Sequence, residues 1–212
     1  MVDMGVLTIG GVVLAGGQSS RMGRPKELLG WKGGTLIGHV VSEVTALNLP
    51  CLIVSNAPDR LPGEVTGLSG VSVTGDLVPS AGPISGIVTA FRVRREEALL
   101  VLSCDLPFAD REQIGRLLAH AQRTEEWDVV AVRTDGRLHP LFALYHRRTQ
   151  PMWEEALRAG RHRLMEVLER LRIAETPPGL LDDWAAYNAN TPEEYRKALA
   201  EQHAREAGRK PT

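Results

Sequence analysis

The chain has 212 residues, a length that suits one domain with a sizeable core. Its formal net charge of −1 argues against a general nucleic-acid binder, because affinity for phosphate backbones depends on clustered excess positive charge. With 43% hydrophobic and 24% charged residues, the composition is that of an ordinary globular protein. No apolar run approaches the roughly 20 residues that span a bilayer, and no basic segment precedes the first apolar stretch, so we expect a cytoplasmic protein without membrane contacts.

A buried strand at residues 9–15 is the first predicted element, because its apolar character is unbroken. It leads into a loop of small and polar residues with little side-chain bulk. Gly16 and Gly17 can adopt positive φ and bring backbone N–H groups close to an anion. The alternative interpretation is a surface loop that is rich in glycine only because it turns sharply.

Three cationic side chains follow in the same loop, Arg21, Arg24 and Lys26. Their charges are suited to pair with a triphosphate. Lys26 is one of only four lysines in the chain, so abundance does not explain its place there. The loop has neither the Gly-Lys-Ser/Thr of a Walker loop nor the spacing of G-x-G-x-x-G, which excludes these two phosphate-binding motifs.

Helices and strands alternate along the next part of the chain. We expect a helix from the cap at Thr35 to before Pro50, strands at 51–54, 71–74 and 98–103, a helix at 84–95, and a helix from the cap at Asp110 to about residue 122. This alternation is typical of an α/β fold, a doubly wound and mostly parallel sheet covered by helices on both faces.

Polar residues follow the ends of four predicted strands. They are the glycine loop, Ser55 with Asn56, Asp76, and Asp105. Because ligands bind at the carboxyl ends of the strands in such sheets, we expect these residues to converge at one edge and form a site.

The second half of the chain departs from a purely parallel topology. Asp135 and Gly136 separate two strand-like runs at 129–133 and 138–145, which predicts an antiparallel hairpin inserted in the sheet. Two helices at 151–159 and 163–171, a short run near Ile173 and a last helix that starts at Thr191 follow. We expect a single domain over residues 1–204 and a polar, frayed tail at 205–212.

The two cysteines, Cys51 and Cys104, each lie at the edge of an apolar strand. Buried, reduced thiols are the expected interpretation, and a disulfide between them stays open. We do not expect Cys104 to be a nucleophile, because no basic residue that would lower its pKa lies nearby in the sequence.

The motif LAGG-x-S-x-R-M-G-x-x-K at residues 14–26 resembles the signature of nucleotidyltransferases that join a nucleoside triphosphate to a phosphorylated small molecule. Within that superfamily the chain most resembles the molybdenum cofactor guanylyltransferases, a MobA-like family, over residues 12–199. Three further segments carry the likeness, namely the Cys-Asp-x-Pro at 104–107, the Gly-Pro-x-x-Gly at 82–86 and the Asn-x-Asn-Thr-Pro at 188–192.

The resemblance implies a Rossmann-like sheet of the nucleotide-diphospho-sugar transferase type. It also implies transfer of GMP from GTP to the terminal phosphate of molybdopterin, with release of pyrophosphate. A phosphate monoester is already largely ionised at pH 7, because its second pKa is about 6, so the reaction needs no general base. Transient contact with molybdoenzyme-maturation proteins is a further expectation from the family.

The resemblance also assigns roles to residues. Arg21, Lys26 and Asp105 are the implied catalytic residues, and Asp105 is the implied ligand of Mg²⁺, although an aspartate in this place could also merely cap its turn. The residues implied to contact the nucleotide or second substrate are Leu14, Ala15, Gly16, Gly17, Lys26, Asn56, Asp76, Gly82, Pro83, Gly86, Asn188 and Asn190.

Several alternatives stay open at this point. Asp76 and Asn190 are also suited to turns, Ser55 competes with Asn56 as the nucleotide contact, and His139 reads as structural. Pro25 before Lys26 is a version of the loop that also occurs in cytidylyltransferase relatives. Transfer of CMP, another small-molecule phosphate as acceptor, and a non-catalytic nucleotide-binding protein are therefore the alternative functions.

Overall fold

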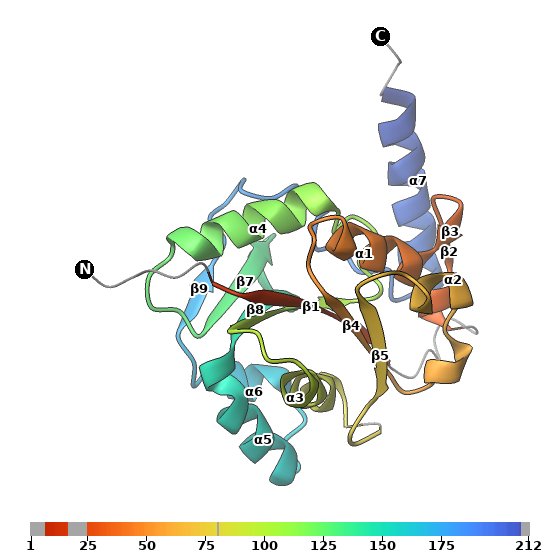
Figure 1. Ribbon diagram of the computed structural model, residues 1–212. Helices are drawn as coiled ribbons and strands as arrows, with labels where there is room; N and C mark the ends of the chain where they lie inside the picture. The colour runs from red at the N-terminus through yellow and green to blue at the C-terminus, as the bar shows by residue number, and fades with distance from the viewer. Residues whose placement is uncertain (1–6, 17–24, 80, 209–212) are drawn as a thin grey trace.

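The computed structural model describes residues 7–16, 25–79 and 81–208. Within these ranges, seven strands form one sheet in the order β5-β4-β1-β6-β8-β7-β9 (Figure 1). The strands are β1 (Ile9–Ala15), β4 (Cys51–Ser55), β5 (Val71–Gly75), β6 (Ala98–Ser103), β7 (Val129–Thr134), β8 (Arg137–His146) and β9 (Ile173–Glu175). Two further strands, β2 (Gly30–Trp31) and β3 (Gly34–Thr35), form a separate small antiparallel pair.

The first four strands of the sheet are parallel, and β8 is antiparallel to both of its neighbours. β9 then pairs in parallel with β7 at the far edge. The turn between β7 and β8 has positive φ at Asp135 (49°) and Gly136 (71°), as a two-residue hairpin turn requires. The predicted fold class is therefore confirmed, including the hairpin.

Helices cover both faces of the sheet. They are α1 (Leu36–Thr45), α2 (Gly63–Thr66), α3 (Pro83–Val93), α4 (Arg111–Arg123), α5 (Gln150–Arg158), α6 (Leu164–Leu168) and α7 (Pro192–Gly208), with short 3-10 turns η2 (Lys26–Leu28), η3 (Pro58–Arg60) and η4 (Arg147–Thr149). Figure 1 shows α1 and α4 on one face and α3, α5 and α6 on the other. No helix in these described ranges is long and apolar enough to cross a membrane.

The alternation of side chains along β1 explains why its sequence is apolar throughout. Val13 and Ala15 enter the core cluster under α1 and α4, whereas Val12 and Leu14 enter the cluster under α3 and α5. A strand buried on both faces has no side that water selects for polar residues. The central position of β1 thus follows from its composition.

Helix caps agree with the sequence. Thr35 Oγ1 accepts from Gly38 N (3.2 Å) at the start of α1, and Asp110 Oδ1 accepts from Gln113 N (3.0 Å) at the start of α4. Thr191 Oγ1 accepts from Glu194 N (3.2 Å) before α7. These side chains satisfy backbone donors that have no partner within the first turn.

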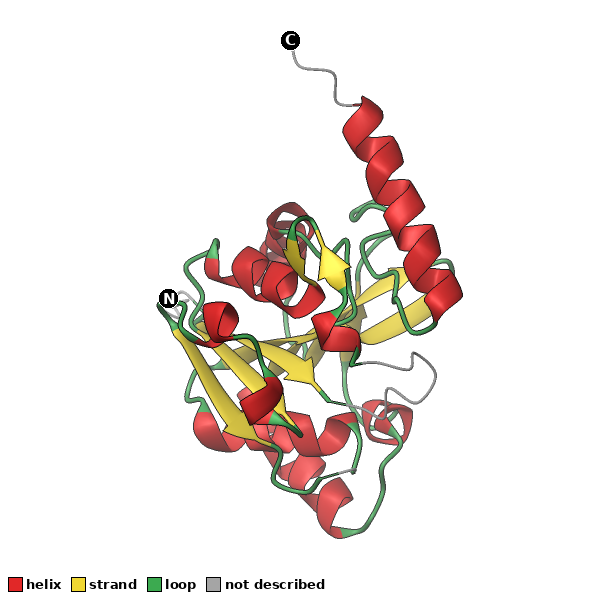
Figure 2. Ribbon diagram, turned by 90° about the vertical axis from the view of Figure 1, so that its right-hand side faces the viewer, coloured by secondary structure: helices red, strands yellow, loops and turns green. Residues whose placement is uncertain are grey.

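The C-terminal tail requires a correction. The frayed tail expected at 205–212 is wrong for residues 205–208, because α7 continues to Gly208. Arg205 donates to Asp182 (2.8 Å) and to Glu201 (2.7 Å), and its guanidinium lies 4.8 Å from the centre of the Phe108 ring. These contacts hold the last turns to the body of the protein, although Figures 1 and 2 show the end of α7 projecting beyond the layers.

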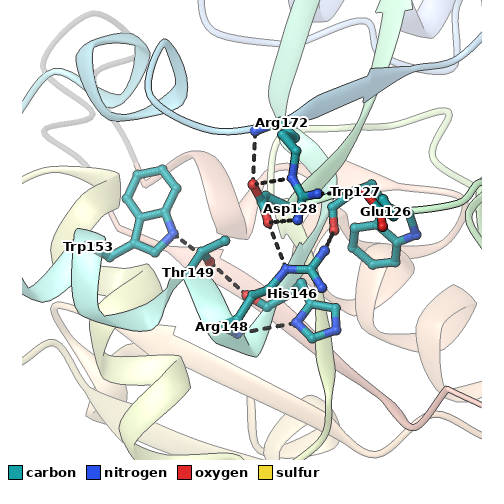
Figure 3. Close-up of polar contacts among 8 residues, drawn as sticks. All are labelled: Glu126, Trp127, Asp128, His146, Arg148, Thr149, Trp153 and Arg172. Atoms are coloured by element: carbon teal, nitrogen blue, oxygen red, sulfur yellow. Dashed lines mark hydrogen bonds and ion pairs between the residues drawn. The ribbon is translucent and has the colours of Figure 1, made fainter.

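Ion pairs join β7, β8 and β9 at the edge of the sheet where β7 and β9 begin (Figure 3). The Asp128 carboxylate accepts from Arg148 Nε (2.7 Å) and from Arg172 N (3.0 Å) and Nε (3.2 Å). Burial alone would raise the pKa of the Asp128 carboxyl, but the hydrogen bonds from Arg172 and Arg148 lower it to about 2. The two guanidinium groups tie the end of β8 and the start of β9 to the start of β7.

Candidate functional site

The edge where the parallel strands end is the place that the sequence predicts for a site. The registers pair Ala15 with Ser55 and Ser55 with Gly75, and Leu14 with Ser103, so the strands β5, β4, β1 and β6 end side by side. The segments that follow them therefore meet at one edge of the sheet.

Lys26 and Asp105 lie together at this edge. Lys26 Nζ is 3.6 Å from Asp105 Oδ2, and it donates to Asn190 Oδ1 (2.6 Å). Asn188 Nδ2 donates to the other carboxylate oxygen, Asp105 Oδ1 (2.9 Å). One cation, one carboxylate and two amides thus form a single cluster.

Backbone contacts hold this cluster in place. Asp105 follows β6 directly and is only 5% exposed, and its carbonyl accepts from Ala189 N (3.0 Å). Ala189 is fully buried between the two asparagines, so its burial presents both asparagine side chains to Asp105 and Lys26. Lys26 opens η2, the short turn that returns the glycine loop to the core.

Both cysteines are free and buried, which answers the question of a disulfide. Burial, and after it the negative charge of Asp105, raises the pKa of the Cys104 thiol well above its ordinary value. A protonated thiol is a poor nucleophile. The structure therefore gives no support to Cys104 as a nucleophile.

A cavity of about 500 Å³ lies at the same edge of the sheet, and its lining includes Ser103, two residues before Asp105. Its lining residues are Leu14, Gly16, Val54, Asn56, Asp76, Pro79, Gly82, Pro83, Gly86, Ser103 and Leu141. Seven of them are residues that the sequence predicted as ligand contacts. Such a volume is within the range of small-molecule pockets.

Two glycines allow close approach around this cavity. A Cβ on Gly16 would lie 2.9 Å from Asn56 Nδ2, and a Cβ on Gly86 would lie 2.9 Å from Leu14 Cδ2. Real Cβ atoms do not approach other atoms this closely, so a larger residue at either position would require the side chain of Asn56 or of Leu14 to move. They bring the β1 loop, the β4 loop and α3 together around one space.

The choice between Ser55 and Asn56 is decided by their surroundings. Ser55 is 2% exposed, and its Oγ accepts from Ala57 N (3.1 Å), so it stabilises the turn after β4. Asn56 lines the cavity beside Gly16. The geometry therefore favours Asn56 as the residue available to a ligand.

Some predicted contacts lie elsewhere. The Ala15 side chain is buried in the core cluster on the opposite face, because successive side chains of a strand point to opposite sides. The contact predicted for Ala15 is through its backbone, and it stays a prediction. Lys26, Asn188 and Asn190 surround Asp105 instead of lining the cavity. The predictions for Gly17 and Arg21 lie outside the described residues.

A second cavity, of about 530 Å³, has the two asparagines in its lining. Its lining residues are Thr134, Asp135, Arg137, His139, Asp183, Ala186, Tyr187, Asn188, Asn190 and Glu194. Thr134 Oγ1 lies 2.8 Å from His139 Nε2, and burial lowers the pKa of His139. From the sequence alone, His139 is interpreted as structural, because no local pattern relates the β7–β8 hairpin to the distant asparagines.

The Asp105 carboxylate is the candidate ligand for a metal ion in this cluster. Among the described residues there is no group of three or more His, Cys, Asp or Glu side chains that could enclose a metal ion. Asp105 Oδ2 lies 3.6 Å from Lys26 Nζ, beyond hydrogen-bond distance. Mg²⁺ is commonly held by one or two carboxylates together with phosphate oxygens and water, which this carboxylate fits.

Comparison with known proteins places this geometry in context. The family model described as MobA-like NTP transferase domain matches residues 11–175. A probable molybdenum cofactor guanylyltransferase of Carboxydothermus hydrogenoformans is 31% identical over 192 residues, 88% of this chain and 93% of that protein. A protein of the same description from Bacillus thuringiensis is 32% identical over 193 residues, 89% of this chain and 94% of its own length.

Solved structures share the fold. Molybdopterin-guanine dinucleotide biosynthesis protein A from Archaeoglobus fulgidus superposes with a TM-score of 0.76 at 23% identity. The match covers 92% of this chain and 99% of that one. The seven-stranded sheet with helices on both faces is thus a fold that solved structures share.

Proposed function

Because the chain belongs to the MobA-like NTP transferase domain family, we propose that it transfers GMP from GTP to the terminal phosphate of molybdopterin and releases pyrophosphate. The observation that carries this proposal is the contact of Lys26 with Asp105 beside a cavity of about 500 Å³. The names of the two relatives support GTP and molybdopterin as substrates.

In this proposal the reaction is a displacement at the α-phosphorus of GTP. An oxygen of the acceptor phosphate forms a new bond to the α-phosphorus. The bond between the α-phosphorus and the oxygen that bridges to the β-phosphate breaks, and this oxygen leaves as part of pyrophosphate. The acceptor is already ionised at neutral pH, so no side chain needs to remove a proton. The protein contributes alignment and charge neutralisation.

Lys26 and Asp105 divide this work. The ammonium of Lys26 offsets negative charge on the phosphates, and Asn190 holds it in place. Asn188 orients the Asp105 carboxylate, the residue that would hold Mg²⁺. Bound there, Mg²⁺ supplies Lewis-acid stabilisation of the triphosphate charge.

The two cavities suit two substrates. The cavity beside Gly16 and Asn56 is lined by the strand-end loops, and we place the nucleotide there. Asn188 and Asn190 line the second cavity while they bind Asp105 and Lys26, so we place the acceptor on that side. Transfer of the product to molybdoenzyme-maturation proteins stays a prediction.

The test is pyrophosphate release from each of the four nucleoside triphosphates, with Mg²⁺ and with molybdopterin or other phosphorylated acceptors. We expect turnover with GTP and molybdopterin. Turnover with CTP would instead identify a cytidylyltransferase, and another productive acceptor would change the substrate assignment. Nucleotide binding without turnover for any acceptor would favour a non-catalytic binding protein.

A further inference from the structure

The Asp76 carboxylate, which lines the 500 Å³ cavity, is held by two hydroxyls of α3. Ser85 Oγ donates to Asp76 Oδ1, and Thr89 Oγ1 lies 3.3 Å from the same oxygen. Ser85 and Thr89 are 0% and 2% exposed, and they lie four residues apart on one face of the helix. These buried hydroxyls have no place in the reaction scheme above.

The protons of these hydroxyls can be assigned. Ser85 Oγ accepts from Val78 N (3.0 Å), so its one proton is available for Asp76. Thr89 Oγ1 accepts from Leu77 N (3.0 Å), and its proton is closer to the Ser85 carbonyl (2.8 Å) than to Asp76. Ser85 is therefore the principal donor to the carboxylate, while Thr89 fixes the backbone beside it.

The consequence concerns the second carboxylate oxygen. Asp76 is half-buried, and within the described residues its Oδ2 has no hydrogen-bond partner. With Oδ1 turned toward α3, the carboxylate cannot rotate without breaking the bond to Ser85. A carboxylate accepts but does not donate hydrogen bonds, so Oδ2 is a fixed acceptor at the cavity wall.

We propose that Ser85 is a positioning residue that orients Asp76 so that Oδ2 accepts a hydrogen bond from an N–H or O–H group on the nucleoside half of the bound nucleotide. The inference rests on the proposed function, since it takes the cavity as the nucleotide site. It adds that α3, and not only the strand-end loops, decides which nucleoside is retained.

The experiment is a double-mutant cycle with Asp76→Ala, Ser85→Ala and the double variant. The readout is the dissociation constant of GTP with Mg²⁺, measured by calorimetry without acceptor. Loss of a hydrogen bond to a charged group corresponds to roughly a tenfold weaker affinity, which we expect for Ser85→Ala alone. In the Asp76→Ala background the same change should have little further effect, because Ser85 acts through Asp76.

Analogues identify the donor. ITP lacks the 2-amino group, 1-methyl-GTP lacks the N1 proton, and the 2′-deoxy and 3′-deoxy forms of GTP each lack one ribose hydroxyl. The penalty of Asp76→Ala should disappear for the analogue that lacks the hydrogen-bonded donor. An equal penalty for GTP and all four analogues would overturn the proposal.

A matched control is Thr149→Val. Thr149 is 1% exposed, and its Oγ1 donates to His146 O (2.7 Å) and accepts from Trp153 Nε1 (3.0 Å) at the opposite edge of the sheet (Figure 3). The Thr149→Val substitution thus removes a buried hydroxyl that does not line the cavity, and the affinity of this variant for GTP should equal that of the wild type. If Ser85→Ala does not fold, Ser85→Cys keeps the volume with a weaker donor and should enter the same cycle with a smaller effect.

The outcomes separate two failures. The inference alone fails under two conditions. The wild-type protein must turn over GTP, and Ser85→Ala must either leave GTP affinity unchanged or weaken it equally in the wild-type and Asp76→Ala backgrounds. A wild-type protein that neither binds nor turns over GTP would end the proposed function. A weakened Ser85→Ala that is additive with Asp76→Ala would show a purely structural role.

Discussion

Asp105 is 5% exposed, and its two oxygens have different surroundings. One accepts from Asn188, and the other faces Lys26 at 3.6 Å. A buried carboxylate is costly unless it is paired and hydrogen-bonded, and here both conditions are met. The carboxylate is therefore both paired and hydrogen-bonded in its buried position.

Replacement of Asp105 by Asn should remove that charge with almost no change in shape. We expect pyrophosphate release from GTP to fall by roughly 10²- to 10³-fold, because the carboxylate that we propose as the Mg²⁺ ligand is lost. Asp59→Asn, at an exposed position, is the matched control and should retain full activity. Normal turnover by the Asp105 variant would contradict the mechanism.

The thiols provide a second prediction at this scale. Burial raises the pKa of Cys51 to about 12, and burial together with Asp105 raises the pKa of Cys104. Because alkylation requires a thiolate, iodoacetamide at pH 8 should label neither cysteine in the native protein. Mass spectrometry should find both labelled in denaturant, and activity should survive the native treatment. Rapid labelling of Cys104 with loss of activity would show that it is a reactive residue.

At the scale of elements, Arg147 closes the C-terminal end of α3. Its guanidinium donates to Phe91 O (3.1 Å), Arg94 O (2.8 Å) and Glu96 O (2.7 Å), and it lies 5.6 Å from the Phe91 ring centre. Carbonyls at a helix C-terminus have no partners within the helix, and a cation there also interacts favourably with the helix dipole. η4 thereby anchors the C-terminal end of α3, whereas the N-terminal end of this helix lines the 500 Å³ cavity.

We therefore expect Arg147→Ala to lower the free energy of unfolding by about 2 kcal/mol, because it leaves carbonyls unpaired. For a chain of this length that is a Tm decrease of roughly 4–8 °C. Arg147→Lys should be intermediate, since it keeps the charge but not the planar fork. Arg95→Ala, an exposed neighbour, should change stability by less than about 0.5 kcal/mol. An Arg147→Ala protein as stable as that control would show that the cap is unimportant.

At the scale of the whole molecule, the Asp128 network makes stability depend on pH. Its folded pKa of about 2 lies below the ordinary value of 3.8, so ionised Asp128 stabilises the folded state. That contribution is fully present above pH of about 4 and is lost as the pH falls toward 2. The network therefore contributes to acid denaturation and not to behaviour near neutral pH.

Asp128→Asn should reveal this dependence. The difference in Tm between wild type and variant should be constant between pH 5 and 8 and should shrink below pH of about 4, as measured by circular dichroism. Glu126→Gln is a suitable control, because Glu126 contacts only the outer side of Arg172 (3.0 Å) and its side chain is 85% exposed. A Tm difference that stays constant down to pH 2 would contradict the assigned pKa.

The parallel part of the fold was predictable because each of its elements carries a local pattern. Apolar runs identified β1, β4 and β6, and side-chain caps at Thr35 and Asp110 identified the starts of α1 and α4. The pair β2–β3 was missed, because two-residue strands have no periodicity to detect. α6 is shorter than predicted, and α7 is longer because Arg205 has tertiary partners.

For the candidate site, the residue types were predictable but their partners were not. Asp105 comes two residues after β6, and Lys26 comes after the loop that follows the neighbouring strand β1, so the topology could predict that both lie near one edge of the sheet. The bonds of Asn188 to Asp105 and of Asn190 to Lys26 join residues 83 and 164 positions apart. No local pattern carries such information.

The sequence by itself determined the fold class, the edge of the sheet that holds the site and the Lys26 and Asp105 candidates, because strand periodicity and loop chemistry are local properties. Only the tertiary structure decided that Asn56 and not Ser55 lines the cavity, that Ser85 holds Asp76, and that the two asparagines complete the Asp105 cluster. Burial and hydrogen-bond partners depend on which distant segments pack together, and that is settled when the whole chain folds.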